Sequence, residues 1–278
     1  MALRDLAAYP KQEPFSEIGA KYHVRVQELG AGVTGQSFAY GDDPYQQVAV
    51  FPAAEPNATV VAFMHGGGWT NGYKEWMAFM APPLTAAGIT FVSIGYRLAP
   101  SVSWPTGIQD AARAVQWIHA NIAEHGGDPD RIVIGGHSAG GHYAAWLAVR
   151  SDWQSPLGLP DDVIKGALPV SGVFDFTEGN GMPMRPRFLG EDPDNDRDAS
   201  PIHTISRTPP FYLSWGDADF PHLITQAEQM ARALYNAGGD VETLVLAGCD
   251  HLGASYACGE NGGVWISGLT SWLNNHFR

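Results

Sequence analysis

Residues 131–150 read RIVIGGHSAGGHYAAWLAVR, and this stretch has the clearest structural pattern in the chain. Its first six residues form a short apolar run, as in a strand buried on both faces. Its last ten residues have the apolar spacing of a helix. The pentapeptide between them, GHSAG at 136–140, has the form G-x-S-x-G, which places a serine on a sharp strand-to-helix turn. We therefore interpret Ser138 as a nucleophile.

The predicted strand before this pentapeptide and the predicted helix after it are stronger evidence than the five residues themselves, because so short a pattern recurs by chance. A tight turn would press side chains at its flanks against the strand and the helix, and glycines at 136 and 140 remove them. Ser138 would lie at a helix N-terminus, where the helix dipole favours negative charge. The alternative, a Gly/Ser turn that only caps the helix, explains less of the pattern.

Short apolar runs alternate with longer amphipathic segments on both sides of this stretch. The expected strands are 59–64, 90–95, 131–136, 165–172, 210–215 and 241–247. The expected helices are 106–124, 141–150, 222–236 and 263–277. This alternation predicts an α/β fold with a mostly parallel central sheet flanked by helices.

Two regions depart from the alternation within what we expect to be a single domain over residues 1–278. Residues 1–57 hold strand-like pieces at 22–29 and 47–51, which predict an antiparallel start to the sheet. Residues 173–209 are rich in Pro, Asp, Asn and Met. A long excursion after a parallel strand lies on the ligand side, so we expect a small cap there, with an ordinary surface excursion as the alternative.

A second motif follows the expected strand 59–64, where residues 65–69 read HGGGW. Consecutive glycines leave backbone N–H groups unshielded, and such donors stabilise the oxyanion formed during acyl transfer. We assign the oxyanion hole to Gly67 and Gly68, with the N–H of Ala139 as third donor. Trp69 and His137 are candidates for the substrate pocket, although an aromatic at 69 would equally suit core packing.

The general base and its acid partner follow from chain order, because Ser, Asp or Glu, and His occur in that order in this type of site. Among ten histidines, His251 follows the last expected strand. Two aspartates, Asp217 and Asp219, follow the strand before it, and we favour Asp219 by its motif position. Asp250 adjoins His251 and is poorly placed to orient it, and Asp175 is a remote candidate.

Composition narrows the class of protein further. The net charge of −13 and the pI of about 5.0 oppose binding to nucleic acid or to an anionic membrane surface. No apolar run reaches the length of a membrane span or of a signal peptide, so we expect a cytoplasmic location. Cys249 and Cys258 flank His251, but a structural zinc needs four clustered ligands, so we predict free thiols and no metal site.

Together these motifs resemble esterases of the hormone-sensitive-lipase-like α/β hydrolases. The resemblance covers about residues 55–275 and rests on HGGGW, YRLAP at 96–100, DPDR at 128–131 before GHSAGG, GDAD at 216–219 and DH at 250–251. The HGGxW form and the compact cap are similar to the branch with kynurenine formamidases and small carboxylesterases. Where the family often has HxF, this chain reads His251-Leu252-Gly253, which affects the pocket beside the base.

The resemblance implies an α/β-hydrolase fold, a Ser138–Asp219–His251 triad and hydrolysis of a small-molecule ester without a cofactor. An amidase or arylformamidase would use the same triad, so its substrate would be a small amide or aryl formamide. A catalytically silent binding protein on this scaffold is the remaining alternative, and the presence of every triad member argues against it. The oligomeric state stays open, with a homodimer as one possibility.

Overall fold

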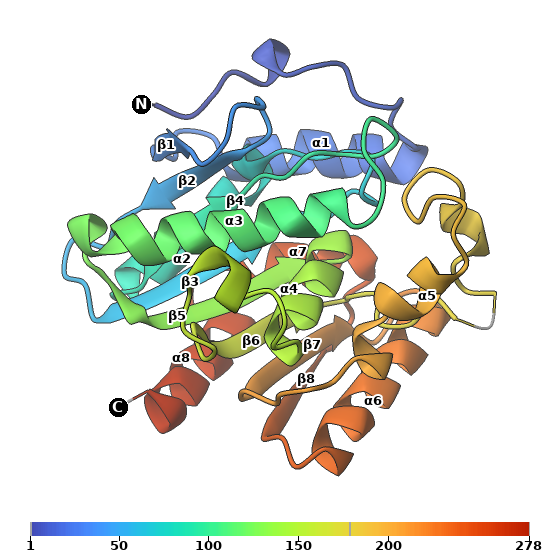
Figure 1. Ribbon diagram of the computed structural model, residues 1–278. Helices are drawn as coiled ribbons and strands as arrows, with labels where there is room; N and C mark the ends of the chain where they lie inside the picture. Colours follow the sequence, from blue (N-terminus) through green and yellow to red (C-terminus); the bar gives the residue numbers. More distant parts are fainter. Residues whose placement is uncertain (1, 178, 278) are drawn as a thin grey trace.

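The computed structural model describes residues 2–177 and 179–277. Within these residues, an eight-stranded sheet has the order β1-β2-β4-β3-β5-β6-β7-β8. β2 runs antiparallel to β1 and β4, and every pairing from β4 to β8 is parallel. Figure 1 shows this twisted sheet between two layers of helices. The arrangement confirms the predicted α/β-hydrolase fold with a mostly parallel sheet.

The strands agree closely with the apolar runs of the sequence. They are β1 (Gln36–Ala39), β2 (Gln47–Phe51), β3 (Ala58–Met64), β4 (Thr90–Ile94), β5 (Gly127–His137), β6 (Ile164–Val170), β7 (Phe211–Gly216) and β8 (Val241–Leu246). The inner strands are buried on both faces, which explains why their sequences are almost continuously apolar.

The helices cover both faces of the sheet. They are α1 (Glu17–Leu29), α2 (Ala81–Ala86), α3 (Thr106–Asn121), α4 (Ala139–Val149), α5 (Asp194–Asp198), α6 (Pro221–Asn236), α7 (His251–Ala257) and α8 (Val264–His276). Short 3₁₀ segments are η1 (Leu6–Ala8), η2 (Lys74–Met80), η3 (Ile122–His125), η4 (Ser155–Leu157), η5 (Met182–Met184) and η6 (Pro201–His203). The expected helices 106–124, 141–150, 222–236 and 263–277 correspond to α3, α4, α6 and α8.

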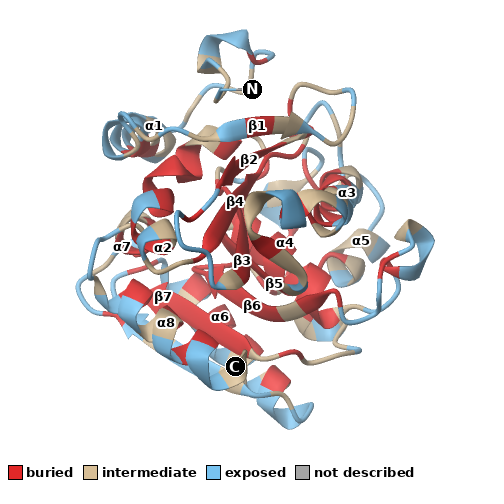
Figure 2. Cartoon of the chain, turned by 90° about the vertical axis from the view of Figure 1, so that its left-hand side faces the viewer, coloured by how far each residue is buried: buried red, intermediate tan, exposed pale blue. Residues whose placement is uncertain are grey.

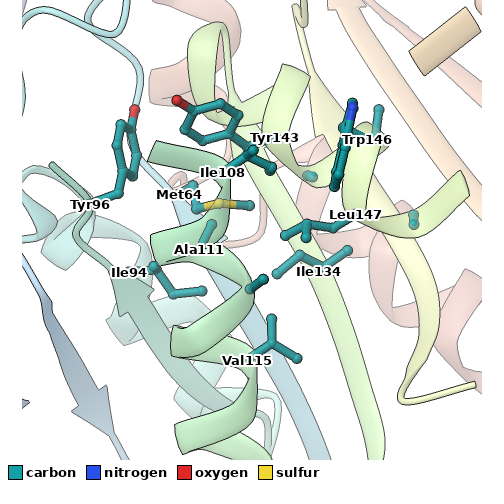
Figure 3. Close-up of a cluster of buried hydrophobic side chains, with 14 of the residues drawn as sticks. Met64, Ile94, Tyr96, Ile108, Ala111, Val115, Ile134, Tyr143, Trp146 and Leu147 are labelled. Atoms are coloured by element: carbon teal, nitrogen blue, oxygen red, sulfur yellow. The ribbon is translucent and has the colours of Figure 1, made fainter. Parts of the chain in front are cut away.

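Two apolar layers hold the fold together, one on each face of the sheet. One contains α3, α4 and α6, and the other contains α1, η2, α2, α7 and α8. In Figure 2 the inner strands are buried, whereas the edge strand β1 is partly exposed and the outer helices are buried mainly on the side that meets the sheet. The first layer is seen in Figure 3, where Val115 of α3 and Leu147 of α4 pack over Ile134 of β5. Such burial contributes about 25 cal/mol per Å² of apolar surface.

The predicted strand at 22–29 is wrong, because these residues form the second half of α1. The polar and apolar residues alternate there, but Ser16 caps the helix by accepting a hydrogen bond from the Gly19 N–H at 3.1 Å. Tyr22 and Val26, four residues apart, share the buried face, whereas Val24 is 55% exposed. The strand at 47–51 is confirmed as β2, and β1 was not predicted.

The excursion at 173–209 contains η5, α5 and η6 between β6 and β7. Phe176 and Phe188 from this segment are buried against Trp69, at ring-centroid distances of 5.5 and 4.1 Å. Its packing is thus continuous with the core layer over α4. Within the described residues, no helix is long and apolar enough to cross a membrane.

Candidate active site

Ser138 occupies the turn between β5 and α4. Its backbone has φ 55° and ψ −116°, a conformation that costs a non-glycine residue about 1–3 kcal/mol. The flanking glycines make this turn possible: a Cβ on Gly136 would lie 2.2 Å from the Gly140 backbone, and one on Gly140 would lie 2.3 Å from the Met64 carbonyl oxygen. The sequence therefore folds into a strained turn that presents the serine at a helix N-terminus.

The glycine loop after β3 faces this serine. Gly67 and Gly68 have φ values of 107° and 60°, in the region that favours glycine. In the described chain neither N–H has a backbone hydrogen-bond partner, and the N–H of Ala139 is the first of α4 and has no intrahelical acceptor. These three groups are free to bind a developing anion.

Buried aromatic contacts fix the start of this loop. The ring of His65 stacks on Tyr96 at a centroid distance of 4.3 Å, and the Tyr96 hydroxyl donates to the His65 carbonyl oxygen at 2.8 Å. Burial lowers the pKa of His65 to about 4, so its ring is neutral. The contacts of His65 therefore support the shape of the loop.

His251 and Asp219 meet at the same edge of the sheet. Nδ1 of His251 lies 2.9 Å from Oδ1 of Asp219, whose side chain is fully buried, whereas that of His251 is 12% exposed. Burial alone would raise the pKa of Asp219, but the hydrogen bond and charge of His251 lower it below its usual value. The lowered pKa favours the ionised form of Asp219 beside Nδ1 of the imidazole.

The other aspartates considered from the sequence have different partners. Asp217 accepts a hydrogen bond from the Gly248 N–H at 2.7 Å, and Asp250 caps α7 by accepting from the Gly253 N–H at 2.7 Å. Asp175 contacts Thr177 and lies 3.3 Å from His203. Among the aspartates considered for this role, Asp219 is the one paired with His251.

A cavity of about 340 Å³ brings these groups together, a size suited to a small ligand. Its floor contains Ser138, His251, Gly67 and Gly68. Its walls are supplied by four other parts of the chain: Glu13, Pro14, Ser16, Ile18, Gly19 and Tyr22 near the N-terminus; Thr70, Asn71 and Trp76 after the glycine loop; Arg187 in the excursion; and Phe220 and Leu252 near the triad.

His137, a predicted pocket residue, lines this cavity and contacts the proposed base. Its Nε2 donates to the carbonyl oxygen of His251 at 2.9 Å, and the two rings lie 4.7 Å apart. Burial, helped by repulsion from His251, lowers the pKa of His137 to about 3. Its neutral ring therefore supports His251 without competing for protons.

Trp69, the other predicted pocket residue, lies in the core instead. It is only 3% exposed, stacks on Phe188 and donates from Nε1 to Nδ1 of His142 at 3.2 Å. His142 in turn donates from Nε2 to the Ala199 carbonyl oxygen at 2.7 Å. Core packing, the alternative for an aromatic at this position, is thus what the structure has, because the excursion covers the indole.

The N-terminal contribution to the cavity was missed. Glu13 and Arg187 form an ion pair at 3.3 Å and join the N-terminal segment to the excursion at the cavity wall. Of the described residues in 173–209, Arg187 alone reaches the cavity, so the predicted cap forms a smaller part of the wall than residues 13–22. Nothing in the composition of residues 9–16 signals this role, because it depends on contacts with chain more than fifty positions away.

The two cysteines are free thiols; Cys258 is buried and Cys249 is partly exposed. Burial raises the pKa of both thiols. In residues 2–177 and 179–277, no three His, Cys, Asp or Glu side chains converge in a way that could hold a metal ion.

The fold and this constellation of residues define a class of protein. A family model described as alpha/beta hydrolase fold matches residues 61–254. The chain therefore belongs to the α/β-hydrolase family, which confirms the resemblance drawn from its motifs.

The chain is similar in sequence to proteins that are named as esterases. It is 34% identical over 197 residues to esterase LipQ of Mycobacterium tuberculosis, covering 65% of this chain and 47% of that protein. It is 42% identical over 174 residues to carboxylesterase NlhH of the same organism, covering 59% and 51%. The chain thus spans about half the length of these curated relatives.

Solved structures share the fold. The carboxylesterase EstE1 from a metagenomic library superposes with a TM-score of 0.76 at 22% identity, covering 94% of this chain and 97% of that one. At this level of identity the likeness concerns the fold.

Proposed function

We propose that this chain is a serine hydrolase that cleaves small carboxylic esters through an acyl-enzyme. The observation that carries the proposal is that His251, held by Asp219 at 2.9 Å, lines one cavity with Ser138 and the glycine loop. A nucleophile, a base with its orienting acid, and free N–H donors are the groups that acyl transfer requires.

In acylation, Nε2 of His251 takes the hydroxyl proton of Ser138 while Oγ attacks the carbonyl carbon of the ester. The carbonyl oxygen becomes an anion and accepts hydrogen bonds from the N–H groups of Gly67, Gly68 and Ala139. The tetrahedral intermediate then collapses, and the C–O bond to the alcohol breaks. His251 returns the proton to the departing alkoxide, and an acyl-enzyme remains on Ser138.

Deacylation repeats these steps with water as nucleophile. His251 takes a proton from water, the hydroxide attacks the acyl carbon, and the bond to Oγ breaks. The proton passes back to Ser138 and the carboxylic acid leaves. Asp219 stays ionised throughout and holds the imidazole with Nδ1–H toward its own carboxylate and Nε2 toward the serine.

The choice of ester over amide rests on the relatives, since LipQ and NlhH carry the names esterase and carboxylesterase. The cavity volume favours a small acyl group and a small alcohol. An arylformamidase would use the same groups, but no feature of the cavity favours a formamide.

The proposal is tested by measuring hydrolysis of p-nitrophenyl acetate, butyrate and octanoate, together with labelling by a fluorophosphonate probe. We expect turnover that is highest for the shorter esters, and labelling of wild type that is lost in Ser138→Ala. The variant should lose turnover by about 10⁴-fold or more while keeping its thermal midpoint, because an elbow serine has few packing contacts to lose. Turnover close to wild type in Ser138→Ala would refute the proposal, and an unlabelled, inactive wild type would favour the binding-protein alternative.

A further inference from the structure

Residues 9–13, here called the N-terminal strap, bind to the segment that follows the glycine loop. Figure 1 shows the N-terminal part of the chain, in dark blue, running along the top of the view to the start of α1. The strap begins at Tyr9, whose hydroxyl accepts from Nζ of the buried Lys74 at 2.9 Å and contacts the carboxylate of Glu75 at 3.0 Å. Tyr45 then donates to the Pro10 carbonyl oxygen at 3.0 Å.

Gln12 makes the central contact of the strap. Its Nε2 donates to the Gly72 carbonyl oxygen at 2.8 Å, and its Oε1 accepts from the Gly72 N–H at 2.9 Å. Nε2 also donates to the Tyr45 hydroxyl at 2.9 Å. One side-chain amide thus satisfies both the N–H and the carbonyl oxygen of a buried glycine. Because the amide has one donor end and one acceptor end, it can make this pair of bonds in one orientation only.

Gly72 is in turn packed against the beginning of the glycine loop. A Cβ on Gly72 would lie 2.2 Å from Nδ1 of His65 and 2.8 Å from the Gly66 carbonyl oxygen. Gly72 therefore has no free space on that side. If Gly72 moved toward His65 and Gly66, those two residues would have to move as well.

A second connection runs through Asn71. Its Nδ2 donates to the Glu13 carbonyl oxygen at 2.6 Å, and its backbone N–H donates to the Gly67 carbonyl oxygen at 3.0 Å. A Cβ on Gly67 would lie 2.1 Å from the Asn71 carbonyl oxygen. Asn71 thus connects the strap directly to Gly67, one of the proposed oxyanion donors.

These contacts matter because glycines have the most conformational freedom to lose, whereas oxyanion donors stabilise charge only when they are already in place. Gly67 and Gly68 have no side chains through which the core could hold them. The loop is fixed before the glycines by Tyr96 and after them by the turn at 70–72, to which the strap is bound.

We propose that Gln12 is a positioning residue for the oxyanion hole, acting through Gly72 and, with the Glu13 carbonyl, through Asn71. The inference rests on the proposed function, because it concerns the geometry of the same site. Gln12 touches no reacting atom; it holds the turn at 70–72 so that the N–H groups of Gly67 and Gly68 point at the anion before substrate arrives.

The test compares Gln12→Met and Gln12→Ala with wild type, and uses Lys11→Ala, an exposed neighbour in the strap, as the matched control. Gln12→Met keeps the length of the side chain and removes its hydrogen bonds. Hydrolysis of p-nitrophenyl acetate is measured, because so small an acyl group isolates chemistry from contacts with the walls. The rate is expressed per active site titrated to completion with a fluorophosphonate, so that any unfolded fraction does not enter kcat.

We expect kcat to fall about 10-fold to 100-fold in both Gln12 variants with KM changed less than 3-fold, because a displacement near 1 Å costs this much rate. The affinity for a boronic acid that mimics the tetrahedral intermediate should fall by the same factor, and Lys11→Ala should match wild type. A role in folding alone would lower the thermal midpoint and leave kcat per titrated site unchanged.

A kcat per titrated site within 2-fold of wild type in Gln12→Met would overturn the inference. The outcome is separate from the fate of the proposed function. If wild type turns over the ester and Ser138→Ala does not, normal rates in both Gln12 variants reject the positioning role alone. If wild type is inactive, the proposed function itself has failed.

Discussion

At the scale of single residues, the two aspartates after β7 make different hydrogen bonds. Asp219 is buried and contacts His251, whereas Asp217 accepts from the Gly248 N–H. We expect Asp219→Asn to lower kcat by about 10⁴-fold, because an amide favours the wrong imidazole tautomer. Asp217→Asn keeps an oxygen for the Gly248 N–H and should stay within about 3-fold of wild type.

The measurement is ester hydrolysis by both variants at pH 7 and pH 9, with the folded fraction checked by circular dichroism. Asp217→Asn serves as the matched control, since it makes the same chemical change two residues away. A larger loss in Asp217→Asn than in Asp219→Asn would reassign the acid.

Position in the chain was sufficient to predict that Ser138, Asp219 and His251 lie at one edge of the sheet. Ser138, Asp219 and His251 each follow the carboxyl end of a strand, and parallel strands bring such ends to one edge. The role of Trp69 could not be predicted in this way, because burial of its indole depends on Phe188 from a segment without periodicity.

At the scale of elements, the glycine loop shows a contrast between neighbours. Gly67 has φ 107° and no room for a Cβ, whereas Gly68 has φ 60° and no atom within 4 Å of its Cβ position. We expect Gly67→Ala to lower kcat by at least 10²-fold. The added methyl group forces the loop away from Asn71, and this movement displaces the N–H donors of the proposed oxyanion hole. Gly68→Ala meets only the cost of a left-handed conformation, about 1–2 kcal/mol, and should retain more rate.

Both variants are compared by kcat for p-nitrophenyl acetate and by thermal unfolding. Gly68→Ala serves as the reference, because it adds the same methyl group to the adjacent position. Equal losses in the two variants would contradict the steric argument.

The element predictions succeeded where burial dictates the residue pattern and failed where it does not. Strands β3, β4, β6 and β7 are buried on both faces or nearly so, and their approximate ranges follow from the sequence. α1 covers the sheet with one narrow stripe, and the alternation at Tyr22, Val24 and Val26 suits a strand equally well by period. The hydrogen bond that caps the helix at Ser16, six residues before the alternation starts, favours the helix over the strand.

At the scale of the whole molecule, the cavity is assembled from distant parts of the chain. The residues at its floor could be predicted because βα alternation brings the carboxyl ends of parallel strands to one edge of the sheet. Its walls could not, because Glu13 and Arg187 meet only after the N-terminal segment and the excursion have both folded onto the sheet. Contacts of this kind leave no local pattern in the sequence.

The fold also buries three histidines as neutral groups. Burial lowers the pKa of His65 to about 4, and those of His137 and His142 to about 3, from an ordinary value of 6.5. At pH values between each lowered pKa and 6.5, these histidines are protonated in the unfolded chain and neutral in the folded chain. Stability therefore rises with pH through this window and falls on acidification from pH 6.5, whereas the lowered pKa of Asp219 acts in the same direction only below about pH 4.

Each such proton changes the free energy of unfolding by about 1.4 kcal/mol per pH unit, so that three histidines approach about 4 kcal/mol per unit between pH 6 and pH 4. A domain with a stability of about 5–15 kcal/mol should then lose a large part of that stability within this range.

Urea unfolding followed by tryptophan fluorescence at half-unit steps from pH 7.5 to pH 4.5 measures the slope. His142→Gln removes one titrating group and should reduce that slope by about a third, whatever it does to stability at pH 7.5. A free energy of unfolding that stays constant between pH 6.5 and pH 5 would show that these histidines are protonated in the folded protein.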